Sequence, residues 1–134
     1  MKKIILVLLL LMLIGCSASK ETKLNHDQLM LGDVSSIAGE YINSEGRVIS
    51  LDAEDIKERL TSEVVYTDQK YYYLNVRTDD GMFGVGLHIY PVGVEVTTWS
   101  SQEGYFIMDT DTSKVRIYYG HDIPLSENEI YEKK

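Results

Sequence analysis

The 134-residue sequence predicts a mainly β protein, an antiparallel β-barrel or β-sandwich of about eight strands with a short N-terminal helix. Residues 82–90 alternate apolar side chains with polar or small ones, which is typical of a strand with one buried face. Short apolar segments also recur at close spacing between turn residues, as in antiparallel β proteins. Ten tyrosines accompany one tryptophan and two phenylalanines, and tyrosine favours strands.

The N-terminal third predicts helical turns followed by a hairpin. Residues 24–31 are rich in leucine and are followed by Gly32, as at a helix C-terminus, so we expect a short helix there. Asp33 could cap a second turn that ends at Gly39. Residues 40–51 then read as two extended segments around Gly46, where a positive φ angle is easily adopted, and this predicts a β-hairpin.

Residues 52–60 have apolar side chains at helical spacing behind Asp52, a suitable N-cap, and predict one or two helical turns. The segment 121–134 is polar and could end in a short strand pairing through Ile130 and Tyr131. About eight short strands form an antiparallel sheet that either closes as a lipocalin-like barrel, the preferred alternative, or splits into two layers. We expect the remaining strands at 63–67, 70–77, 82–90, 94–98, 105–108 and 115–119.

The first sixteen residues predict a lipoprotein signal peptide. Two lysines precede an apolar run of 11 residues, which is too short for the roughly 20 needed to span a bilayer. The run ends in Leu13-Ile14-Gly15-Cys16, which looks like a bacterial lipobox, in which the cysteine thiol is acylated and the chain is cut before it. Cys16 is the only cysteine, so an intrachain disulfide is excluded.

Three regions follow from this assignment: a signal peptide over 1–15, a lipidated cysteine and flexible tether over 16–24, and one β-rich extracytoplasmic domain over 25–134. We expect a monomer on the extracytoplasmic face of the cell membrane. The net charge is −8, or −10 without the two lysines of the signal peptide. This negative field repels phosphate backbones and anionic headgroups, so we expect no nucleic-acid partner and a membrane contact made by lipid on Cys16.

Three stretches resemble an uncharacterised domain family of Gram-positive surface lipoproteins. The first is Ser35-Ser36-Ile37-Ala38-Gly39-Glu40-Tyr41-Ile42-Asn43 with Gly32-Asp33 before it and Gly46 after it. The others are Ile89-Tyr90-Pro91-Val92-Gly93-Val94 and Asp111-Thr112-Ser113-Lys114-Val115-Arg116-Ile117-Tyr118. The resemblance implies a place in this family and transfers no active site, because the family has no assigned function. Tyr41 stands where the family commonly has tryptophan.

No pattern in the sequence predicts catalysis, a metal or a cofactor. Residues 109–113 space their oxygens as at the start of a calcium loop, but Lys114 and Gly120 stand where that loop needs glycine and glutamate, so we interpret them as a turn. The three histidines are too far apart for a local zinc pair. There is no Gly-x-Ser-x-Gly elbow, and lipidation would occupy Cys16.

The aromatic residues are the best candidates for a binding site. Residues 71–73 are three consecutive tyrosines, which a strand would place on alternate faces, and Tyr105, Tyr118 and Tyr119 add to the supply. Our hypothesis is a non-enzymatic binding module for a small amphipathic molecule, a glycan or a protein. The alternatives are an envelope hydrolase or its accessory factor, and a structural or shielding surface protein. The candidate ligand-facing residues are Tyr41, His88, Tyr90 and Trp99.

Overall fold

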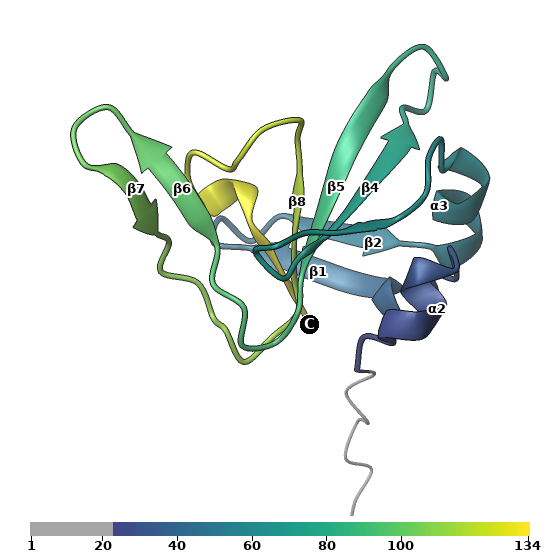
Figure 1. Cartoon of the computed structure of the whole chain (residues 1–134), viewed down its shortest axis with the longest axis horizontal. Coiled ribbons are helices and arrows are strands. Elements are labelled where there is room, and N and C mark those ends of the chain that lie inside the picture. Colours follow the sequence, from purple (N-terminus) through teal and green to yellow (C-terminus); the bar gives the residue numbers. More distant parts are fainter. Residues whose placement is uncertain (1–22) are drawn as a thin grey trace, which may run out of the picture.

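The computed structural model describes residues 23–134, and these contain nine strands in two antiparallel sheets (Figure 1). The prediction of a mainly β, antiparallel fold is confirmed. The expected signal peptide over 1–15, Cys16 and most of the tether lie outside the described residues. Within the described part of the chain, every helix is too short or too polar to cross a bilayer.

The predicted N-terminal helices form close to their expected positions because local side chains cap them. Helix α2 (His26–Met30) begins where the Asn25 side chain accepts a hydrogen bond from the amide of Gln28, and a 3₁₀ turn, η1 (Ser35–Ile37), follows it. Helix α3 (Ala53–Arg59) begins at Asp52, whose Oδ1 accepts a hydrogen bond of 2.9 Å from an amide in the first turn.

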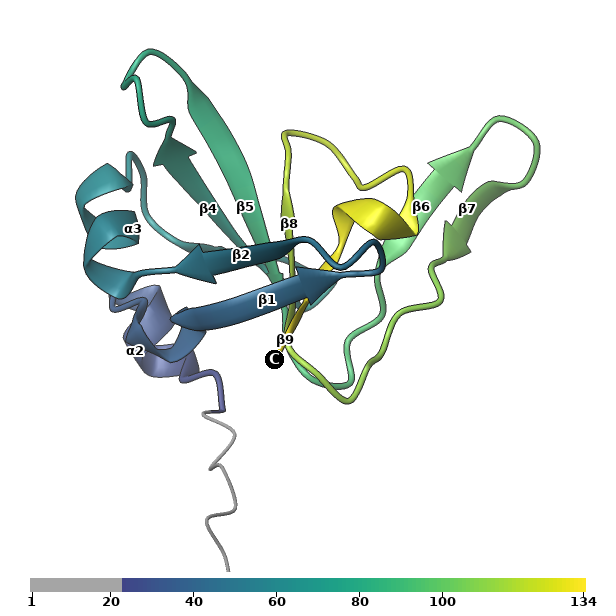
Figure 2. The same cartoon turned by 180° about the vertical axis from the view of Figure 1, so that it is seen from behind.

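The strands of the larger sheet are β1 (Gly39–Asn43), β2 (Val48–Leu51), β3 (Val65–Tyr66), β4 (Tyr72–Arg77), β5 (Gly84–Tyr90), β8 (Arg116–Tyr119) and β9 (Tyr131–Lys133). They lie side by side in the order β2–β1–β9–β8–β5–β4–β3. The two remaining strands, β6 (Thr97–Ser100) and β7 (Gly104–Ile107), form a separate hairpin (Figure 2). A second 3₁₀ turn, η2 (Glu127–Glu129), precedes β9.

The larger sheet does not close into a barrel, so the preferred alternative was wrong and the sandwich-like one fits. Its edges are β2 and β3, which do not pair with each other. Helix α3 connects these two edges in the chain, and Ile56 on α3 and Leu29 on α2 are buried in the main core. Helices therefore cover the side of the core where a barrel would need further strand pairing.

Strand β5 buries both of its faces, whereas β4 buries one face and leaves the other half-buried or exposed, and this arrangement creates the candidate site. Tyr72 and Leu74 on β4 and Ile89 on β5 belong to the main core. The alternate residues face the other way, where Tyr90 packs in a smaller cluster with Val96, Met108, Tyr118 and Ile130. The long apolar strand of residues 82–90 thus separates two packed layers.

Two strands differ from their predicted positions. We expected a strand over 94–98, but β6 begins at Thr97, because the Arg116 guanidinium binds the carbonyl oxygens of Pro91 and Val94 at 2.8 and 2.5 Å. These carbonyls are therefore held in a loop. The pairing that we expected through Ile130 and Tyr131 forms as β9, which begins at Tyr131. It lies between β1 and β8 in the interior of the sheet.

Candidate functional site

An open cleft of about 560 Å³ lies between the outer face of β4 and β5, the β6–β7 hairpin and the segment 121–125. We call it the aromatic cleft, because aromatic rings dominate its lining. The hairpin that forms one side projects from the body on the side opposite α2 and α3 (Figures 1 and 2). The residues that line the aromatic cleft are Gln69, Tyr71, Tyr73, His88, Trp99, Tyr105, His121, Asp122, Ile123 and Leu125.

Strand register places the rings of the aromatic cleft. Tyr73 on β4 is directly opposite His88 on β5, so both side chains leave the same face of the sheet. Trp99 on β6 is directly opposite Tyr105 on β7, so these two share one face of the hairpin. Trp99 is 47% exposed and Tyr105 is 76% exposed. Two large aromatic side chains at the cleft are therefore available to a ligand.

His88 forms the floor of the cleft and is 3% exposed. Four tyrosine rings surround it: Tyr71 is stacked on it at a centroid distance of 5.3 Å, Tyr73 and Tyr118 meet it edge-on at 5.1 Å, and Tyr90 lies 6.4 Å away. Burial lowers the pKa of His88, and its hydrogen bond to the backbone of Gly120 opposes this shift in part. The imidazole is therefore neutral at pH 7.

The tautomer of His88 follows from its one hydrogen bond. Nε2 lies 3.0 Å from the carbonyl oxygen of Gly120, and a carbonyl can only accept, so Nε2 carries the proton and donates it. Nδ1 is then an acceptor, and among the described residues it has no hydrogen-bond partner. A buried acceptor without a hydrogen bond costs free energy of folding and is rare in proteins, so the unpaired Nδ1 is an unusual feature of the cleft floor.

Gly86 allows the rings to pack tightly against β5. A Cβ atom at this position would lie 2.4 Å from the carbonyl oxygen of Gly120 and 2.6 Å from the ring of Tyr73. A glycine inside a strand often marks a close approach by another backbone or a ligand. At Gly86 the close neighbours are the chain's own Tyr73 ring and the backbone of the segment after β8.

The four sequence-predicted ligand-facing residues do not lie together. His88 and Trp99 both line the aromatic cleft. Tyr41 is fully buried in the main core, where its hydroxyl donates a hydrogen bond of 2.7 Å to the carbonyl of Ile37 and burial raises its pKa. Tyr90 is 3% exposed and packs under the cleft instead of lining it. Cys16 lies outside the described residues.

Tyr71, Tyr73 and Tyr105 belonged to the aromatic supply recognised in the sequence but not to the four residues selected as ligand-facing. Tyr71 and Tyr73 could have been selected, because their alternation with Tyr72 puts them on the face opposite Leu74. For Tyr105 and Asp122 the sequence gives no signal of a place in the cleft. Their positions depend on how the hairpin and the segment after β8 fold back toward β4.

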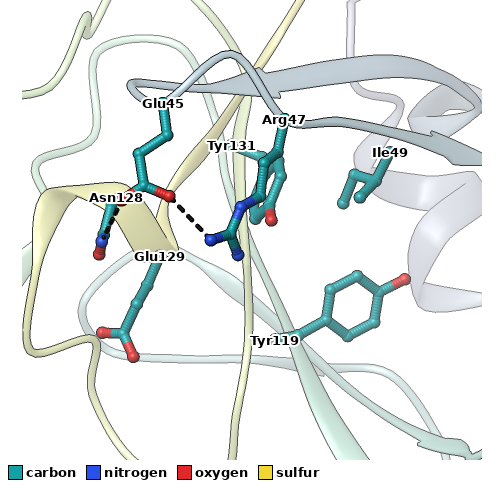
Figure 3. Close-up of a pocket in the computed structure, with 7 residues that line it drawn as sticks. All are labelled: Glu45, Arg47, Ile49, Tyr119, Asn128, Glu129 and Tyr131. Atoms are coloured by element: carbon teal, nitrogen blue, oxygen red, sulfur yellow. Dashed lines mark hydrogen bonds and ion pairs between the residues drawn. The ribbon is translucent and has the colours of Figure 1, made fainter.

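A second cleft, of about 440 Å³, contains acidic and basic side chains (Figure 3). Glu45 pairs with Arg47 at 3.1 Å and accepts a hydrogen bond from the Asn128 amide at 3.0 Å. Glu129 accepts hydrogen bonds from the backbone amides of Leu125 and Ser126. Both carboxylates hold the surrounding loops, so this cleft provides no observation that favours the hydrolase alternative.

The turn that we interpreted from residues 109–113 forms at 111–114, around Asp111 and not Asp109. Asp111 Oδ1 accepts hydrogen bonds from the amide and the hydroxyl of Ser113 at 3.0 and 2.5 Å. Within residues 23–134, no three histidine, cysteine or acidic residues gather in a way that could hold a metal ion.

Comparisons with known proteins give no relative: no protein-family model, curated protein or solved structure matches this chain. The function must therefore be argued from the cleft itself.

Proposed function

We propose that this protein is a lipid-anchored binding module of the bacterial cell envelope and that the aromatic cleft is its ligand site. Cys16 would carry the lipid, and the domain would act on the extracytoplasmic face without catalysis, as a member of the Gram-positive lipoprotein family that it resembles. The observation that carries the proposal is that Tyr71, Tyr73, Trp99 and Tyr105 line one cleft together with the buried His88.

The dimensions and lining of the cleft support a small ligand. A volume of about 560 Å³ falls in the range of small-molecule sites, which run from about 300 to 1,000 Å³. Such sites combine apolar and aromatic walls with a few polar groups, and here Gln69 and Asp122 lie beside the rings. A protein with only a shielding role would not require exposed aromatic rings at a cleft, so this arrangement favours the binding module.

The fluorescence of Trp99 tests this assignment, because it is the only tryptophan in the chain. We would titrate the full-length protein in detergent with a panel of membrane lipids, envelope glycans and small organic ions. At least one probe should change the Trp99 emission saturably, and Tyr105→Ala should weaken its binding about ten-fold or more, since large aromatic side chains dominate binding sites.

Tyr66→Ala is the matched control, because Tyr66 is a partly exposed tyrosine on β3 that lies outside the cleft lining. It should leave the titration unchanged. A panel to which Trp99 gives no response, or equal losses in the two variants, would contradict the assignment of the ligand site to the aromatic cleft.

A further inference from the structure

We propose that the aromatic cleft selects an organic cation, a small molecule that carries a quaternary ammonium or alkylated amine group. This inference rests on the proposed function, because it names the ligand class of the same cleft. It combines two observations, the number of aromatic side chains that line the cleft and the sign of the charge among the lining residues.

The ring faces provide the attraction. The face of an aromatic ring carries partial negative charge and attracts cations, most strongly for tryptophan. Trp99 and Tyr105 line the cleft from the hairpin, Tyr73 lines it from β4, and Tyr71 lies immediately before β4. The alkyl groups of an organic cation would also contact Ile123 and Leu125 in the same lining. An organic cation has a positive charge and apolar alkyl groups, and it therefore matches both the aromatic and the aliphatic side chains of the lining.

The charged residues of the cleft have the complementary sign. Asp122 belongs to the lining, and none of the described lining residues is lysine or arginine. The field of Asp122 reaches the cluster beneath the cleft, because it contributes to raising the pKa of the Tyr118 phenol, after burial and Glu129. The whole chain has a net charge of −8, which raises the local concentration of cations.

Anionic ligands fit this cleft poorly. A phosphate or carboxylate would lie near Asp122 without a lysine or arginine among the described lining residues to balance its charge. His88 cannot supply that charge at pH 7, since burial lowers its pKa. Neutral sugars lack this repulsion but also gain nothing from the negative field. We therefore expect the cleft to bind a cation more tightly than an uncharged molecule of the same shape.

The experiment compares choline with 3,3-dimethylbutan-1-ol, which has the same shape but no charge. Trp99 emission of the full-length protein in detergent is titrated with each compound and with neutral monosaccharides. Choline should bind at least about ten-fold more tightly than the uncharged compound, a difference of about 1.4 kcal/mol. Its affinity should fall as sodium chloride is added, because salt screens the contribution of the acidic residues.

Two variants with the same change in net charge locate the effect. Asp122→Asn should weaken choline binding several-fold and leave the uncharged compound unaffected. Glu54→Gln, at an exposed site on α3 outside the cleft lining, should leave both affinities unchanged.

The outcomes separate this inference from the proposed function. Equal binding of choline and the uncharged compound, or a response to monosaccharides without one to choline, would overturn the choice of an organic cation while the cleft remained a ligand site. Absence of any Trp99 response to the broader panel of lipids, glycans and ions would contradict both.

Discussion

The packing around His88 determines the charge state of its side chain. Its ring lies under Tyr71 and is 3% exposed, and its single hydrogen bond goes to the carbonyl of Gly120. The neutral form is favoured because burial penalises the charged imidazolium. In the unfolded chain the same side chain is fully hydrated and has an ordinary pKa of 6.5. The folded and unfolded states therefore bind protons differently in mildly acidic solution.

We predict that the protein loses stability as the pH falls below about 6.5, because the unfolded chain then takes up a proton at His88 that the folded chain does not. The stabilising contribution is fully present above this pH and is lost as the pH falls toward the lower pKa of the folded state. Melting temperatures measured from pH 7.5 to pH 5.0 would show the decrease. His88→Gln should make the decrease smaller over the same range.

His121→Gln is the control for this prediction, because it also removes a histidine but from the exposed surface. The decrease should be as large in this variant as in the wild type. The carboxylate of Asp111 does not contribute in this range. Hydrogen bonds from Ser113 lower the pKa of Asp111 below its ordinary value of 3.8. The stability that the ionised Asp111 contributes is therefore lost only at a more acidic pH. A pH dependence that persisted unchanged in His88→Gln would contradict the role given to the buried imidazole.

At the scale of the elements, sequence patterns predicted what local chemistry determines. The helix before Gly32, the cap at Asp52, the hairpin at Gly46 and the alternation in β5 all lie close to their expected positions. Patterns failed where distant groups decide the structure. The strand expected from residue 94 is replaced by a loop, because the Arg116 side chain, 22 residues further on, binds its backbone. The aromatic cleft could not be predicted for the same reason, because its walls come from three separate parts of the chain.

Arg116 holds two loops against β8, although it is fully buried. Nε donates to the carbonyl of Lys114 at 3.0 Å, Nη1 to the hydroxyl of Thr110 at 3.1 Å, and Nη2 to the carbonyls of Pro91 and Val94. A planar guanidinium can serve these four acceptors at once, and an ammonium group cannot. Burial lowers the pKa of this side chain, while the negative charges of Glu132 and Asp111 oppose that shift.

We predict that Arg116→Lys lowers the free energy of unfolding by about 2–4 kcal/mol, because buried carbonyls lose their partners. Urea denaturation would measure the loss. Arg47→Lys is the matched control: the Arg47 side chain is 72% exposed, and its replacement should change the stability by less than about 0.5 kcal/mol. Equal effects of the two substitutions would show that the network around Arg116 does not stabilise the fold.

At the scale of the whole molecule, we propose that a lipid alone attaches this acidic domain to the membrane. A net charge of −8 opposes electrostatic attraction to anionic headgroups. A diacylglyceryl group on Cys16 would supply two acyl chains, and two chains give stable attachment where one binds reversibly. The ligand preference that we propose uses the same negative field, since the charges that repel headgroups attract organic cations.

We predict that Cys16→Ala releases the protein from membranes, because the variant has no thiol to acylate. Fractionation of cells that express the wild type or the variant would measure the distribution. The circular dichroism spectrum and melting temperature of the variant should match those of the wild type, since the described fold begins after this residue. A variant that remained in the membrane fraction after removal of the signal peptide would contradict the lipid anchor.

The position of β9 has a consequence for the order of folding. This strand is formed by Tyr131–Lys133 and pairs with both β1 and β8. Without it, the larger sheet would divide into β2–β1 on one side and β8–β5–β4–β3 on the other. The pairing of β9 with β1 joins residues far apart in the sequence, and contacts of this kind form slowly because a long loop must close first. The larger sheet is therefore completed late in folding, when β9 enters between two parts that already exist.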